Sequence, residues 1–119
     1  MSKGAQRQPV IDTSVFEAMP DALKAILPAM IEAGLRDMEE QLAIIKSAQV
    51  SDDHTALIRG MHSIKSCSAQ LGGKTLSDFA VQREHAYING EFDTLAQDIL
   101  QLEEHVAAFK EGIAAIKAN

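Results

Sequence analysis

The stretch TALIRGMHSIKSCSAQLGG, residues 55–73, decides the fold class of this chain. Its apolar side recurs in steps of four, three, four and three residues, which is the repeat of one face of an α-helix. A half-buried β-strand would alternate apolar and polar residues instead. The Gly72-Gly73 pair predicts the end of this helix. The stripe consists of Leu57, Met61, Ile64, Ser68 and Leu71.

Three further stretches predict long helices, with polar joints between them. Residues 20–49 carry a stripe of the same spacing, and Pro28 inside it predicts either a kink or a helix that restarts there. A polar break follows residues 20–49, and Ser51, Asp52 or Asp53 in it can cap the helix of residues 55–73. Residues 74–90 predict the helix after that one. They begin with Thr75 and Asp78 in capping-box spacing and end at the turn signal Asn89-Gly90. Residues 94–117 predict the last helix, with the most regular stripe of all. The two regular stripes are Ile31, Leu35, Met38, Leu42 and Ile45, and Phe92, Leu95, Ile99, Leu102, Val106, Phe109, Ile113 and Ile116.

The N-terminal part predicts a tail and one short helix. Residues 1–10 are small and polar and indicate a disordered tail or linker. Residues 11–19 predict a short helix with Asp12 or Thr13 as its N-cap. Residues 11–119 are therefore expected to form one all-α domain, an antiparallel four-helix bundle with a short additional N-terminal helix. The last stripe alone would also suit a coiled coil, but the other three stripes need covering.

Composition and charge exclude several functions. The 119 residues carry a net charge of −6, which argues against bulk attraction to nucleic acid or direct contact with an acidic membrane surface. No apolar run approaches the ~20 residues that cross a bilayer, and the lone Cys67 has no intrachain disulfide partner. We therefore expect a cytoplasmic protein, or the cytoplasmic end of a membrane-bound sensor.

His62 is expected at the solvent edge of the core on the helix of residues 55–73. At about 100° per residue, the positions within about 60° of it include cations and very small residues. An ordinary exposed face would more often carry long polar side chains. The small residues on this face therefore suggest a surface that another protein can approach. The neighbours on this predicted surface are Ile58, Arg59, Lys65, Ser66, Ala69 and Gly73.

This set of residues suits a histidine that carries a phosphoryl group. Neutral imidazole is a nucleophile, and Lys65, with Arg59 on the other side, can offset the charge of a phosphoryl group on it. However, a histidine three residues before a lysine is most often only a solvated pair. The spacing alone leaves the function open.

The segment HSIKSCSAQLGGKTLSDFAVQRE, residues 62–84, resembles the signature of histidine-containing phosphotransfer (HPt) domains. That signature has a histidine, then an aliphatic residue, a lysine, small residues, an aliphatic-glycine pair, a leucine and a final glutamate. Its positions correspond here to His62, Ile64, Lys65, Ser66, Ser68, Leu71-Gly72, Leu76 and Glu84. Ser66 departs from the family's usual glycine and Met61 from its usual alanine.

The resemblance implies that His62 is phosphorylated, that Lys65 stabilises the phosphohistidine and that Ser66 keeps the approach open. It implies response-regulator receiver domains as partners, each bringing the acceptor aspartate and Mg²⁺, so that the chain needs no cofactor of its own. The chain would act as a monomeric phosphoryl carrier without an ATP site. A free-standing carrier and the C-terminal domain of a hybrid sensor histidine kinase both fit the sequence. The sensor, the regulator, the stimulus and the net direction of phosphoryl flow are outside what the residues specify.

Three alternative functions can be compared with the residues. A histidine-kinase dimerisation domain would typically place an acidic residue where Ser63 stands and a proline shortly after it. A di-iron bundle would need Glu-x-x-His pairs, which the chain lacks, and His54, His85 and His105 are scattered. A non-catalytic helical adaptor that binds receiver domains stays open as the alternative.

Overall fold

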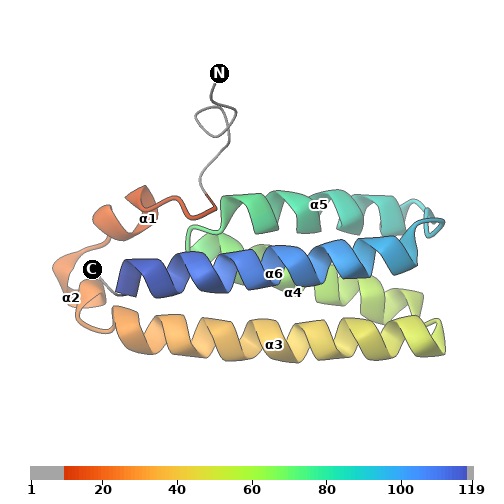
Figure 1. The fold of residues 1–119 in the computed structure, drawn as a ribbon, viewed down its shortest axis with the longest axis horizontal. Helices are drawn as coiled ribbons and strands as arrows, with labels where there is room; N and C mark the ends of the chain where they lie inside the picture. The colour runs from red at the N-terminus through yellow and green to blue at the C-terminus, as the bar shows by residue number, and fades with distance from the viewer. Residues whose placement is uncertain (1–9, 118–119) are drawn as a thin grey trace, which may run out of the picture.

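The computed structural model describes residues 10–117. The predicted tail, residues 1–10, therefore lies outside the described part except for Val10. Within that part the helices follow one another as α1 (Ser14–Glu17), α2 (Asp21–Lys24), α3 (Leu27–Ser51), α4 (His54–Gln70), α5 (Lys74–Ile88) and α6 (Leu95–Lys117). The four long helices form an antiparallel bundle, and the two short ones lie at one end of it (Figure 1). The predicted four-helix bundle is confirmed.

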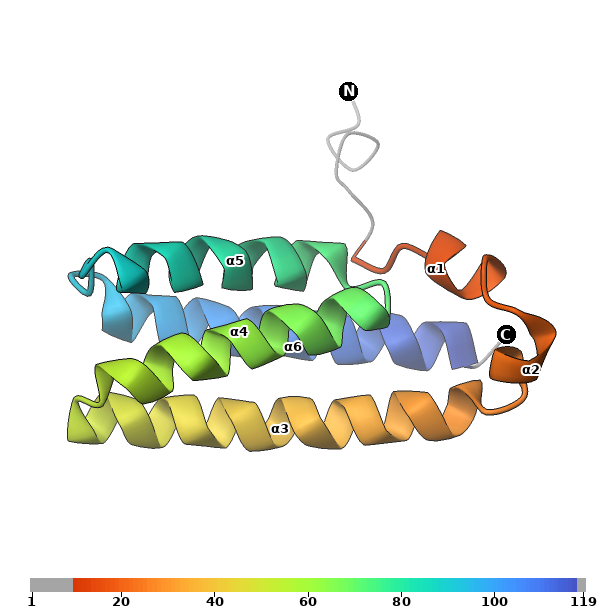
Figure 2. The ribbon, with the colours of Figure 1, turned by 180° about the vertical axis from the view of Figure 1, so that it is seen from behind.

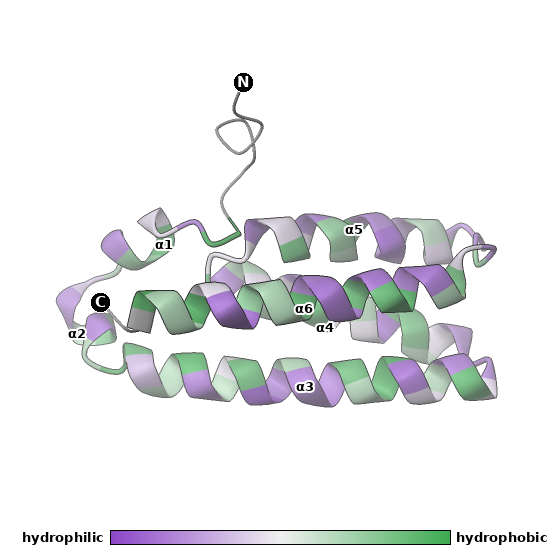
Figure 3. Ribbon diagram, viewed as in Figure 1, coloured by the Kyte–Doolittle hydropathy of each residue, from purple (hydrophilic) through white to green (hydrophobic). Residues whose placement is uncertain are grey.

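Each long helix packs against two others, so the bundle is closed. Helix α4 contacts α3 and α5, and α6 completes the ring by contacting the same two helices. Hydrophobic and hydrophilic residues alternate along each ribbon, as an amphipathic helix requires (Figure 3). The apolar sides meet in one core that includes Ile31, Met38, Ile45, Leu57, Met61, Ile64, Leu76, Tyr87, Leu102, Val106, Phe109 and Ile113.

The helix ends explain most of the predicted boundaries. Pro28 lies in the first turn of α3, where its missing N–H needs no partner, so the helix restarts at this proline as one of the two alternatives predicted. Asp53 is the N-cap of α4 and accepts a hydrogen bond from the Ala56 amide at 3.1 Å. Gly90, after α5, has a φ of 78°, which glycine adopts without strain.

One local prediction was wrong, and the N-terminal part holds one helix more than expected. The expected Thr75–Asp78 capping box does not form, because α5 begins two residues earlier than that box requires, at Lys74 with Gly73 as its N-cap. The predicted short N-terminal helix is present as α1, and the break before α3 leaves a second short helix, α2, which follows Pro20. The chain before α1 is fixed to the bundle, where the Asp12 amide donates to the Gly72 carbonyl at 2.6 Å and Ile11 is buried.

Candidate functional site

His62 lies in the middle of α4 with its side chain 58% exposed, at the edge of the core as the helical spacing predicted. The neighbouring core positions Met61 and Ile64 are fully buried and fix how α4 is turned. The imidazole therefore faces solvent because its sequence neighbours face the core. Ser66, one turn further, is exposed as well, so nothing bulky on α4 rises beside the ring on that side.

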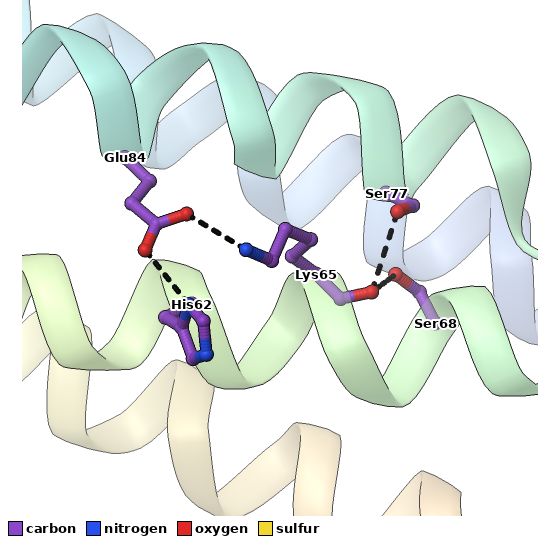
Figure 4. A network of polar contacts seen from close by, with 5 residues as sticks. All are labelled: His62, Lys65, Ser68, Ser77 and Glu84. Carbon is purple, nitrogen blue, oxygen red and sulfur yellow. Dashed lines mark hydrogen bonds and ion pairs between the residues drawn. The ribbon is translucent and has the colours of Figure 1, made fainter.

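Glu84 on α5 connects the two residues that the sequence placed together. One carboxylate oxygen, Oε2, lies 2.8 Å from His62 Nδ1, and the other, Oε1, accepts from Lys65 Nζ at 3.1 Å (Figure 4). The Glu84 side chain is only 10% exposed, and Lys65 is 28% exposed. The site is thus a three-residue chain that crosses from α4 to α5.

Electrostatics assigns the proton between Glu84 and His62. Burial alone would raise the pKa of Glu84, but the hydrogen bonds and charges of His62 and Lys65 outweigh it and lower that pKa. An ionised carboxylate only accepts hydrogen bonds, so His62 Nδ1 must donate. In the neutral ring the second nitrogen, Nε2, then holds a free electron pair.

The seam between α4 and α5 holds this geometry. Ser77 on α5 donates from its hydroxyl to the Lys65 carbonyl at 3.3 Å, and the Ser68 hydroxyl donates to the same carbonyl at 3.2 Å (Figure 4). The Ser68 hydroxyl also lies 2.6 Å from the Ile64 carbonyl. The Ser77 bond crosses from α5 to α4, whereas the Ser68 bonds stay within α4 and satisfy a buried hydroxyl there.

The predicted partner surface is only partly exposed. Arg59 and Ala69 are exposed, and Ile58 is half-buried against the core. The prediction for Gly73 was wrong, because this residue is buried and a Cβ added to it would lie 2.6 Å from the Phe109 ring. The reason is that helical spacing relates residues only within one helix, and α4 ends at Gln70.

A groove between α3 and α4 opens beside His62. It encloses about 510 Å³ and joins, through the shared residues Gln41 and Ser63, a second hollow of about 450 Å³ nearer the start of α4. Gly34 on α3 lies close to the Leu71 side chain at the groove, since a Cβ on Gly34 would lie 2.7 Å from Leu71. Cys67 donates to the Gly34 carbonyl in the same place, at 3.1 Å.

The other histidines occupy different surroundings. His54 stacks on Phe92 with ring centroids 3.8 Å apart and contacts Asp52, and His105 lies 4.7 Å from the Phe79 ring. Within residues 10–117, no three of the side chains His, Cys, Asp and Glu gather in a way that could hold a metal ion. No helix in the same range is long and apolar enough to cross a membrane.

The role of Glu84 is the part of the site that sequence reasoning missed. Glu84 is the last residue of the family signature, but the helical spacing predicts no contact between it and His62. The signal available was the glutamate at an otherwise core-facing position of the helix of residues 74–90, since a buried carboxylate needs partners.

Fold and site together define a class of protein. Residues 29–119 match the family model of the Hpt domain, and the chain belongs to this family of histidine phosphotransfer domains, which act in two-component phosphorelays with response-regulator receiver domains. Helices α1 and α2 precede the matched residues.

A solved structure shares the whole fold. The crystal structure of histidine-containing phosphotransfer protein B (HptB) from Pseudomonas aeruginosa PAO1 superposes with a TM-score of 0.83. The alignment covers 95% of this chain and 99% of that one, at 22% sequence identity. At this identity the likeness concerns the fold. No curated protein matches the sequence significantly.

Proposed function

We propose that His62 is the phosphoryl carrier of this Hpt domain and that Nε2 is the nitrogen that reacts. The observation that carries the proposal is the 2.8 Å hydrogen bond from Nδ1 to Glu84, beside an exposed ring. This bond holds the ring in the tautomer whose free electron pair is on Nε2. Lys65 and Ser66 are the proposed assisting residues, one as a nearby cation and one as a small neighbour.

The transfer step needs no general acid or base from this chain, because no proton has to move. The Nε2 electron pair attacks phosphorus, the N–P bond forms, and the bond from phosphorus to the receiver aspartate breaks and returns that carboxylate. The ring keeps its Nδ1 proton and gains positive charge, which the Glu84 carboxylate stabilises. The reverse step charges another receiver, with Mg²⁺ expected on the receiver to neutralise the transferring group.

Arg59, Ala69 and Ile58 are proposed to contact the receiver, together with Ser66. We also propose a monomer in the cytoplasm that has no cofactor of its own. The chain would act either as a free-standing carrier or at the end of a hybrid sensor histidine kinase. The positive charges of Arg59 and Lys65 support the proposed contact with the receiver, because the receiver's acceptor site is acidic.

The test is transfer from a receiver domain charged with acetyl phosphate, followed by intact-mass measurement with and without brief acid treatment. An acid-labile gain of about 80 Da (the mass of one phosphoryl group) that His62→Gln lacks is the expected result, because histidine N–P bonds are acid-labile. Ser66→Arg should fold normally, as judged by circular dichroism, and accept phosphate more slowly. A wild-type chain that binds receivers but gains no mass would instead be a helical adaptor.

A further inference from the structure

Asp98, in the first turn of α6, is a buried carboxylate both of whose oxygens accept hydrogen bonds. The residue is 3% exposed. Its Oδ2 accepts from the Tyr87 hydroxyl at 2.8 Å and from the Arg83 guanidinium at 3.2 Å, and its Oδ1 accepts from the Thr94 hydroxyl at 3.0 Å. A buried charge needs such partners, and this one has three donors. We call Arg83, Tyr87, Thr94 and Asp98 the Asp98 cluster.

The Asp98 cluster holds α5 at the end of the bundle where α5 ends and α4 begins. Arg83 and Tyr87 are one turn apart on α5, so α6 binds that helix in two successive turns. The Tyr87 ring stacks on Phe92 with centroids 4.9 Å apart, and Phe92 stacks in turn on His54, the first residue of α4. The end of α5 and the starts of α4 and α6 lie at the same end of the bundle in Figure 2. Three helices are therefore connected there.

Apolar side chains fix the rotation of α5 only weakly between Leu76 and Tyr87. The buried positions in this stretch are Ala80, Glu84 and Ala86, which are two small residues and a charged one. Hydrophobic contact has no preferred direction, whereas a hydrogen bond requires a near-linear geometry. The polar contacts of α5 therefore decide how far this helix is turned about its own axis.

Glu84 lies beside the two contacts with Asp98 but points to a different helix. At about 100° per residue, Tyr87 lies about 60° and Arg83 about 100° from Glu84 around the axis of α5, both on the same side. That side meets α6, whereas Glu84 reaches α4 and contacts His62 there (Figure 4). Polar contacts thus hold α5 from two directions, and loss of those with α6 leaves only one.

A small rotation of α5 is enough to separate Glu84 from His62. A side-chain tip about 5–6 Å from the helix axis moves about 2 Å when the helix turns by about 20°. The hydrogen bond between Glu84 Oε2 and His62 Nδ1 is 2.8 Å long, and a separation beyond about 3.5 Å is no longer a hydrogen bond. The His62 ring then loses the acceptor that selects its tautomer.

We propose that Asp98 is a positioning residue for phosphoryl transfer. By binding Arg83 and Tyr87 it fixes the rotation of α5, and this rotation keeps the Glu84 carboxylate on Nδ1 of His62. Its effect on transfer is indirect and passes through Glu84. The inference rests on the proposed function and adds to it a residue that lies on a third helix.

The test measures transfer per folded molecule in Asp98→Ala and Tyr87→Phe. Tyr87→Phe removes one hydroxyl and keeps the stacked ring, so it stays informative if Asp98→Ala does not fold. The matched control is Ile113→Ala, because Ile113 is buried on α6 about 22 Å beyond Asp98 and its truncation destabilises the bundle without touching the Asp98 cluster. Circular dichroism melts give the folded fraction. The two donors are an acetyl-phosphate-charged receiver domain and phosphoramidate, a small molecule.

Asp98→Ala should accept phosphate about three- to tenfold more slowly from both donors, since the loss of Glu84 itself sets the upper limit. Tyr87→Phe should be slowed less, and Ile113→Ala should stay within about twofold of wild type. Asp98→Asn, whose amide oxygen still accepts a hydrogen bond, should fall between Asp98→Ala and the wild type. Nitrogen chemical shifts of the His62 ring should show both tautomers in Asp98→Ala and one in Ile113→Ala.

A double variant separates positioning from general destabilisation. In a Glu84→Ala background, Asp98→Ala should slow transfer no further, because the effects of residues that act through one another are not additive. A further loss in that background, or wild-type rates and ring shifts in folded Asp98→Ala, would overturn the inference. Equal slowing in Ile113→Ala would overturn it too, since the effect would then follow from stability alone.

A failure of the proposed function gives a different result. In that case neither donor labels the wild-type chain, and the role of Asp98 in transfer falls with that of His62. Wild-type labelling together with full activity of folded Asp98→Ala leaves the proposed function in place and overturns only the inference about Asp98.

Discussion

Replacing Glu84 by alanine removes the acceptor that orients the His62 ring. The Glu84 carboxylate takes a hydrogen bond from His62 Nδ1 at 2.8 Å and another from Lys65 at 3.1 Å. A hydrogen bond to a charged group contributes about 1.5–3 kcal/mol. Because the ring is 58% exposed and water screens part of this interaction, the lower end of that range applies.

This loss appears as a slower reaction. At about 1.4 kcal/mol for each factor of ten, Glu84→Ala should accept phosphate from a charged receiver about tenfold more slowly than the wild type. Glu84→Gln is the matched variant, since its amide oxygen still accepts from Nδ1 and its rate should fall between the other two. Quenched-flow measurements with acid-labile label give the rates.

Nitrogen chemical shifts of the His62 ring give an independent measurement. In the wild-type protein Nδ1 should carry the proton of the neutral ring, whereas in Glu84→Ala the two tautomers should both be populated. Circular dichroism melts show whether each variant folds. A folded Glu84→Ala protein with wild-type rate and unchanged ring shifts would refute the orienting role of Glu84.

Three further predictions concern groups outside the phosphoryl site. Gly73→Ala should lower the free energy of unfolding by about 1–3 kcal/mol, because its Cβ would press on Phe109; transfer per folded molecule should not change, and the opposite pattern would return Gly73 to the docking surface. Burial and the hydrogen bond to Asp98 raise the pKa of Tyr87, so above pH ~10 the unfolded chain loses this proton first and wild-type stability falls. Tyr87→Phe should lack that part of the alkaline loss in urea titrations, and identical pH profiles would contradict it. Burial, with the charge of Asp37, raises the pKa of the Cys67 thiol, so iodoacetamide at pH 8 should modify it quickly only in urea; equally fast reaction of the folded protein would be inconsistent with the groove geometry.

The helices were predictable because their information is local. A stripe with steps of three and four residues specifies both the helix and the side that is buried, so Leu57, Met61 and Ile64 were placed correctly in the core. The same logic placed His62 at the edge of the core. It failed at Gly73, where the helix had already ended and the wheel no longer applied.

The missing part of the site depends on how two helices meet. Glu84 is 22 residues from His62, and the register of α5 against α4 decides whether their side chains touch. No repeat within one helix encodes that register.

Sharing Glu84 between His62 and Lys65 also bears on the energy of the phosphorylated state. In a phosphorelay, the phosphorylated intermediate must not be too stable, because otherwise the phosphoryl group is not passed to the next acceptor. A carboxylate behind the ring stabilises the positive charge of the phosphorylated imidazole but repels the phosphoryl oxygens, and Lys65 is the cation near enough to moderate that repulsion. If His62 carries the phosphoryl group as proposed, one anion and one cation on neighbouring helices would set its group-transfer potential, and exchanging either of them would shift the balance between accepting a phosphoryl group and passing it on.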